Sequence, residues 1–268
     1  MAVHKQEAKY TCLAFVSAPI VCALGTLLFC TQAAADVTGH FDLTSKYVLR
    51  GITTTYGPTL PGVGNQGGDA PENNKTALQM GLDYSNTSGF YAGWWASTLG
   101  YSYQSFNDAG TSMEHDLYGG YQGKAGDVGY KLGLTRYQYI PGFHSTALET
   151  MIGLTYKEFG ANMQTLLDDV TFGNKGDTYY TVTYNTPLPK DFAFNASLGY
   201  YTYKKVGPYT NPGASPLAVS SAFRHLNLGM TYPLAKSVTA GATYIIGGKN
   251  RYDVKQDNQL LANISYMF

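Results

Sequence analysis

The chain has 268 residues, a formal net charge of zero and only 13% charged residues. A neutral chain has no field with which to gather nucleic acid or coat an anionic membrane surface, so we expect no nucleic-acid partner. The 24 Tyr, 12 Phe and 31 Gly favour sheets over helices, because aromatic rings fit pleated surfaces and glycine weakens helices.

The first 35 residues have the pattern of an export signal. Lys5 and Lys9 precede the apolar run LAFVSAPIVCALGTLLF, and the small residues of TQAAAD follow it. This order predicts a signal peptide at 1–35, cleaved before Asp36. A retained anchor is the alternative, although a proline and a glycine interrupt the run. All three cysteines lie in this signal, so residues 36–268 have no disulfide and no thiolate metal site.

From residue 36 onward, apolar and polar residues alternate with period two, which predicts β-strands. No run of 18 apolar residues occurs there, so no membrane-spanning helix is expected. Twelve strands are expected, near 37–52, 75–85, 90–99, 113–122, 127–139, 146–157, 161–170, 177–185, 192–203, 222–232, 237–246 and 258–268.

The expected first strand, 37–52, has a largely polar face that carries Asp42, Lys46 and Arg50. Two interpretations are open. These side chains form a ladder that selects small anions, or they brace the wall through salt bridges to Asp83 or Glu114; we favour bracing. With ionisable residues on other polar faces, the predicted pore-lining set is Asp42, Lys46, Arg50, Asp83, Glu114, Asp116, Lys131 and Glu149.

The apolar faces carry aromatic rings near the strand ends, and rings with a polar edge suit membrane interfaces. These rings are Tyr47, Tyr84, Trp94, Tyr121, Tyr130, Tyr156, Tyr184, Tyr200, Tyr232 and Tyr266. A sheet exposed to lipid must close, because unpaired backbone groups are costly in hydrocarbon. We therefore expect residues 36–268 to form an all-β, antiparallel, up-and-down barrel in contact with outer-membrane lipid and lipopolysaccharide. A soluble β-sandwich is the alternative.

The connections between the expected strands are unequal. Short turns at 86–89, 123–126, 158–160, 187–191 and 233–236 alternate with links that are often longer, at 53–74, 100–112, 204–221 and 248–257. Short turns on one rim and longer loops on the other are typical of outer-membrane barrels. The links near 140–145 and 171–176 are short exceptions. The 53–74 or 204–221 loop is a candidate to obstruct the lumen.

Enzymatic and metal motifs are scarce. His144 and Ser145 are adjacent, so on a strand they would point to opposite faces and could not act together as nucleophile and base. The acidic stretch 168–177 lacks the spacing of an EF-hand. We expect neither catalysis nor a metal or cofactor, and a barrel hydrolase stays the weaker alternative.

The last strand alternates apolar residues up to the terminal phenylalanine. This pattern resembles the assembly signal of bacterial outer-membrane proteins, and its residues are Leu260, Ala262, Ile264, Tyr266 and Phe268. The resemblance implies binding to the barrel-assembly machinery through this strand.

Two further segments, TSKYVLRGITTT (44–55) and ALQMGLDYSNTSGFYAGWWAST (77–98), resemble the opening of the TorF-type porin family. The matching residues are Ser45, Tyr47, Arg50, Gly51, Gly81, Asp83, Tyr84, Ser88, Gly89, Phe90, Tyr91, Ala92, Gly93 and Trp95. The resemblance implies a porin without naming its solute, and the 53–74 loop is longer than is usual in that family.

The expected function is passive diffusion of small hydrophilic solutes through a monomeric or weakly oligomeric barrel. Twelve strands give a lumen between the filled interior of eight-stranded barrels and the open channel of sixteen-stranded ones. A structural or ligand-binding barrel with a blocked lumen is the main alternative.

Overall fold

The computed structural model describes residues 35–52, 76–100, 112–209 and 218–268. The signal at 1–35 lies outside them except for its last residue, as do the 53–74 loop and residues 210–217 of the 204–221 loop. The strands are β1 (Asp36–Thr44), β2 (Ala77–Ser85), β3 (Phe90–Thr98), β4 (Met113–Ala125), β5 (Val128–Ile140), β6 (Ala147–Tyr156), β7 (Phe159–Leu166), β8 (Thr178–Pro187), β9 (Ala193–Thr202), β10 (Ser221–Ala235), β11 (Val238–Gly247) and β12 (Gln259–Met267).

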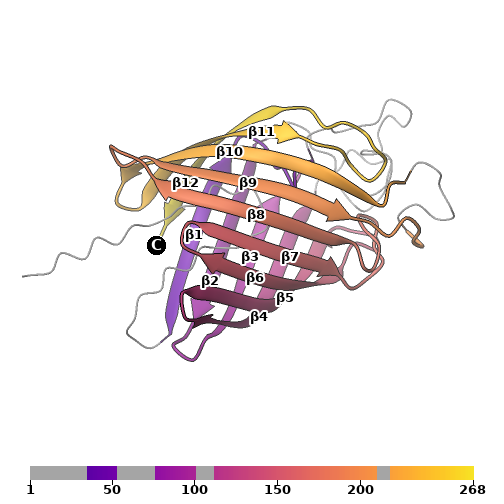
Figure 1. The fold of residues 1–268 in the computed structure, drawn as a ribbon, viewed down its shortest axis with the longest axis horizontal. Helices are drawn as coiled ribbons and strands as arrows, with labels where there is room; N and C mark the ends of the chain where they lie inside the picture. Colours follow the sequence, from indigo (N-terminus) through magenta and orange to yellow (C-terminus); the bar gives the residue numbers. More distant parts are fainter. Residues whose placement is uncertain (1–34, 53–75, 101–111, 210–217) are drawn as a thin grey trace, which may run out of the picture.

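The twelve strands form one closed antiparallel barrel in which each strand pairs with its neighbours in sequence (Figure 1). The ring closes between β1 and β12, with Thr44 opposite Asn263 and His40 opposite Met267. Backbone bonds between Gly39 and Phe268, at 2.9 and 3.0 Å, extend this seam to the last residue. The all-β, twelve-stranded barrel expected from the alternation is confirmed.

Along each strand, side chains alternate between an exposed apolar outer face and an inner face of polar and small residues. In β1, Phe41 and Leu43 are 45% and 54% exposed. The alternate residues Asp42 and Thr44 are only 5% and 1% exposed. The five residues of the expected assembly signal, four in β12 and Phe268 just after it, are all exposed. Within the described residues, no helix is long and apolar enough to cross a membrane.

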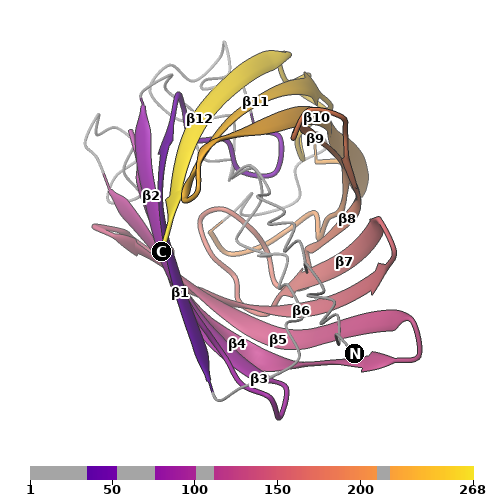
Figure 2. The ribbon, with the colours of Figure 1, turned by 90° about the vertical axis from the view of Figure 1, so that its left-hand side faces the viewer.

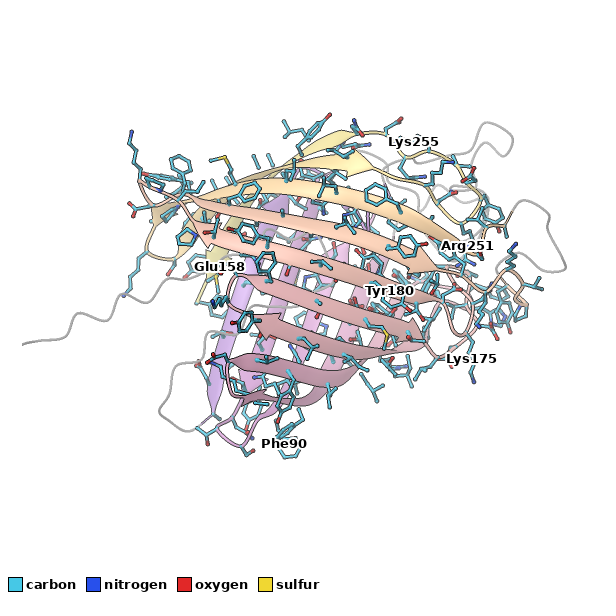
Figure 3. All side chains as sticks on the ribbon, in the orientation of Figure 1. Phe90, Glu158, Lys175, Tyr180, Arg251 and Lys255 are labelled. Atoms are coloured by element: carbon cyan, nitrogen blue, oxygen red, sulfur yellow. The ribbon has the colours of Figure 1, made fainter. Side chains whose placement is uncertain are left out.

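The two rims of the barrel differ as the sequence predicted. β2–β3, β4–β5, β6–β7, β8–β9 and β10–β11 are joined by short turns on one rim, and the longer links lie on the other, the loop rim. Figure 3 shows Glu158 at the short-turn rim, and Lys175, Arg251 and Lys255 at the loop rim, with Tyr180 on the wall between them. Charged groups therefore mark both ends of the wall.

One strand boundary was wrong in a way that matters for function. β1 ends at Thr44, eight residues before the predicted end, and Thr44 pairs with Ala77, the first residue of β2. Tyr47, expected among the outward rings, is buried inside the barrel. The other nine rings of that set are exposed or half-buried in their strands.

Candidate functional site

Residues 45–52, which we call the inner segment, leave the wall and enter the lumen (Figure 2). The backbone N–H of Ser45 donates to the carbonyl of Ala262 at 2.8 Å, and the chain then turns inward. Arg50 and Gly51 both have left-handed backbones, with φ of 49° and 75°. A Cβ at Gly51 would lie 2.6 Å from the Cβ of His225, so this tight turn against β10 requires glycine.

The inner segment reaches the opposite wall through Arg50. The Nη1 and Nη2 atoms of Arg50 donate to Oε1 and Oε2 of Glu149, on β6, at 2.9 and 2.6 Å. Both side chains are almost fully buried. This two-bond geometry is the strong form of an arginine–carboxylate pair. We call the Arg50–Glu149 pair the latch, because it joins a segment that follows β1 to a strand on the far side of the ring.

Tyrosine rings surround the latch. The Oη of Tyr201 accepts from Nη1 of Arg50 at 2.5 Å, and Tyr137 donates to Glu149 at 2.7 Å. The guanidinium carbon of Arg50 lies 4.7 Å from the ring centroid of Tyr179, which is within cation–π range. These rings come from β5, β8 and β9 and keep bulk water from the buried pair.

The other end of the inner segment is fixed by two neighbouring residues. The hydroxyl of Tyr47 donates to Glu114 on β4, and the Tyr47 ring lies 6.4 Å from that of Trp95. Val48 packs in a buried cluster with Ile245 of β11 and Leu261 of β12. The segment is therefore anchored on both sides of the lumen, which it constricts.

A second arginine–carboxylate pair lies at the loop rim. Arg251, between β11 and β12, forms a buried ion pair with Asp177, just before β8. The guanidinium carbon of Arg251 lies 4.8 Å from the Tyr203 ring centroid, and Asp177 also accepts from the backbone N–H of Lys204 at 2.7 Å. Three loops that are distant in sequence thus meet over one part of the lumen.

Most of the predicted pore-lining residues lie on inner faces. Asp42, Asp83, Asp116, Lys131 and Glu149 each have an exposed apolar residue beside them on the outer face, and Glu114 is fully buried in β4. The placement of Lys46 and Arg50 on the face of the first strand was wrong, because both lie on the inner segment. Lys46 donates to Gln259, and Arg50 forms its two-bond ion pair with Glu149, which was not among the partners expected for it from the sequence.

Part of the predicted set lies further along the barrel, away from the latch. Asp83 accepts from the hydroxyl of Tyr118 at 2.6 Å. The Nζ of Lys131 lies 4.1 Å from the Tyr91 ring centroid and within electrostatic range of Asp83. The predicted pore-lining residues therefore do not form one cluster, since Asp83 and Lys131 lie apart from the latch.

The sequence reasoning missed several residues of the constriction. Strand parity could have found Tyr139, Tyr179 and Tyr201, since each lies next to an exposed apolar residue. Tyr137 lies between Arg136 and Gln138 and carries no such signal. Arg224, whose Nε donates to the backbone oxygen of Arg50 at 3.2 Å, lies beside a bulge in β10 that shifts the register. Arg251 and Asp177 lie on loops, where no pattern indicates a contact.

Two histidines of the described residues contact tyrosine side chains. The ring of His144 stacks on that of Tyr209 with centroids 3.9 Å apart, and His225 pairs with the hydroxyl of Tyr179 at 2.6 Å. In residues 35–52, 76–100, 112–209 and 218–268, no three His, Cys, Asp or Glu side chains are grouped to hold a metal ion.

Residues 65–261 match a family model described as "Bacterial protein of unknown function (Gcw_chp)". The chain belongs to the Gcw_chp family. The match includes the second hairpin motif at 77–98 but begins after the inner segment. Comparison with the curated proteins found no match.

Several solved outer-membrane barrels resemble the Gcw_chp protein. The KdgM porin has 7% identity and a TM-score of 0.49, covering 86% of this chain and 99% of the porin. The NanC porin has 11% identity and a TM-score of 0.44, with coverages of 86% and 99%. Outer membrane phospholipase A from Escherichia coli has 12% identity and a TM-score of 0.41, with coverages of 86% and 89%. Because porins and a phospholipase match alike, these similarities do not assign a function.

Proposed function

We propose that this protein is a bacterial outer-membrane channel for small hydrophilic solutes and ions, constricted near its loop rim by the inner segment. The observation that carries the proposal is the alternation of exposed apolar and buried polar side chains around a closed ring. A soluble protein rarely exposes a contiguous apolar patch of more than a few hundred Å². A closed barrel with this outer surface is one of the two structures that can span a bilayer.

The inner face supports passage of polar solutes. Away from the latch, the walls of β8, β9 and β11 present half-buried polar side chains to the lumen, among them Thr183, Asn185, Asn195, Ser197 and Thr239. Hydroxyl and amide groups replace part of the hydration shell of a polar solute without trapping it, which is what a diffusion channel requires.

The seam with β1 supports the proposed role of the last strand in assembly. Tyr266 and Phe268 stack with ring centroids 5.9 Å apart on the outer face, and Phe268 also stacks on Phe41 at 5.8 Å. Exposed rings at alternate positions offer a partner both an apolar stripe and a strand edge before closure. The barrel-assembly machinery is the partner that we propose for this strand.

A second candidate is a structural or ligand-binding barrel with a blocked lumen. It is favoured by the anchoring of the inner segment on both sides of the lumen, through Arg50 on one wall and Val48 on the other. The two candidates share the barrel and the outer membrane, and they differ only in whether ions cross.

Ion conductance of the purified barrel separates these candidates. Residues 36–268, refolded in detergent, should migrate differently on a gel before and after boiling, as a closed barrel resists unfolding by detergent. Inserted into planar bilayers in KCl, this protein should give discrete current steps. A folded barrel that gives no steps, either as wild type or after removal of the latch, would support the blocked barrel instead.

A further inference from the structure

Asp116 differs from the other carboxylates of the constriction in its lack of hydrogen bonds. It lies on the inner face of β4, is 2% exposed, and is flanked across the sheet by Trp95 and Tyr137. Within the described residues, its buried Oδ1 atom has no hydrogen-bond partner. A buried carboxylate oxygen without a donor is costly, so an occupant of the lumen is expected to offset that cost.

The two neighbouring carboxylates are already satisfied. Glu114 accepts from the hydroxyls of Tyr47 and Tyr139, the latter at 2.7 Å. Glu149 is held by Arg50 and also accepts from Tyr137 and from Gln164, at 2.7 and 3.2 Å. Asp116 interacts electrostatically with both carboxylates, and with Arg50, whose two terminal nitrogens are directed at Glu149. The cluster Glu114, Asp116 and Glu149 thus carries more acid groups than Arg50 neutralises.

A second oxygen on the same wall also lacks a donor. The buried Oε1 atom of Gln79, on β2, has no hydrogen-bond partner among the described residues, and Gln79 is 3% exposed. Gln79 pairs across the sheet with Asp42 on one side and with Ser97 on the other. Glu114 follows Ser97 in the same row. The wall from β1 to β4 therefore presents oxygen acceptors, and a cation is the group that such a surface binds.

The other basic side chains near the lumen have partners of their own. Arg251 is paired with Asp177 at the loop rim. Arg224 contacts the backbone oxygen of Arg50 and the hydroxyl of Tyr203 on the β9–β10 side. Lys131 lies roughly 20 Å along β5 from Tyr137, the residue opposite Asp116, at the usual rise per residue. A solute cation at Asp116 would meet carboxylates and aromatic rings first.

We propose that Asp116 is a selectivity-determining residue, which, with Glu114, makes the constriction prefer cations, including small organic ammonium ions, over anions. The inference rests on the proposed channel function. The rings of Trp95 and Tyr137 beside the carboxylate suit an organic ammonium group, because aromatic faces attract desolvated cations. This proposal contradicts the interpretation that Arg50 helps to select anions. The charge of Arg50 is balanced by Glu149, so it leaves no net positive charge to attract anions.

Reversal potentials in planar bilayers test this proposal. Under a KCl gradient, the current through the wild type should have a reversal potential of the sign expected for a cation-selective channel. Even in a water-like medium, the attraction between unit charges about 5 Å apart corresponds to a roughly fourfold change in occupancy, and weaker screening at a buried site enlarges it. The Asp116→Asn variant should therefore lose at least about fourfold in its K⁺/Cl⁻ permeability ratio. Replacing K⁺ by an alkylammonium ion measures whether the organic cation shares the site.

Two further variants make the outcome decisive. Asp116→Glu keeps the charge and should keep the cation preference, which a merely structural role would not predict. Asp127→Asn removes an exposed carboxylate from the β4–β5 turn, outside the lumen, and should leave the reversal potential unchanged. Channels with an unchanged reversal potential in Asp116→Asn would overturn the inference, and so would a wild type without cation preference. A folded wild type without channels would instead overturn the proposed function.

Discussion

In planar bilayers, the Arg50→Ala variant should carry a much larger mean current than the wild type. Arg50 holds the inner segment to Glu149 on the far wall through a buried two-bond pair. Breaking a buried ion pair costs about 3–5 kcal/mol. A loss of that size shifts an equilibrium between a latched and a released segment more than about 100-fold toward release. The barrel wall should survive, since the inner segment contributes no strand to it.

A double variant and a surface control complete this test. In Arg50→Ala, Glu149 loses its cation, so the double variant Arg50→Ala/Glu149→Gln shows whether release or the uncompensated carboxylate changes the current. Lys249 and Asp253 form an exposed pair at the same rim, and Lys249→Ala should have no effect, because exposed pairs contribute little. An unchanged current in Arg50→Ala, with heat-modifiable mobility intact, would show that the latch does not limit passage.

A covalent tether on the other end of the inner segment should have the opposite effect. Val48 is in a buried cluster with Ile245 and Leu261, so cysteine pairs at 48 and 245 and at 48 and 261 are the two to test for disulfide formation. Residues 36–268 contain no other cysteine. Added to Arg50→Ala, the oxidised pair should return the current to the wild-type level, and a reductant should restore the large current.

Two checks accompany the tether. The single Val48→Cys variant should not respond to oxidant or reductant, because it has no partner thiol. Mobility on a non-reducing gel measures the fraction of molecules that are cross-linked. A fully cross-linked protein that still carries the large current would mean that solutes pass beside the inner segment, and the constriction would then lie elsewhere.

The barrel could be predicted from sequence because each strand shows a period-two alternation of apolar and polar residues. In β12, Leu260, Ile264 and Tyr266 face outward at alternate positions, as the period-two pattern requires. The short turns could be placed because glycine, asparagine and proline interrupt that pattern. Both signals are local, and the antiparallel order of neighbours follows once the turns are known.

The inner segment could not be predicted in this way. From Thr44 to Arg50 the alternation is interrupted only at Ser45 and Val48, which is too weak a signal to show that the chain leaves the wall. Pairing with β2 stops at Thr44 and Ala77, but β12 continues past Asn263 to Gln259, so a strand partner is still present on that side where the chain leaves the wall. The pairing of Arg50 with Glu149 depends on how far Arg50 reaches across the lumen. A sequence pattern does not give that distance.

Contact of the outer face with acyl chains is most directly measured with nitroxide labels on single-cysteine variants along β10, reconstituted in lipid vesicles. Leu228 and Met230 face outward, whereas Asn227 and Thr231 face inward. Labels at 228 and 230 should collide mainly with oxygen, which concentrates in hydrocarbon, and labels at 227 and 231 with a water-soluble nickel complex. Labels at 228 and 230 that collide mainly with the nickel complex, or that are immobilised by protein contacts, would contradict a membrane-spanning barrel.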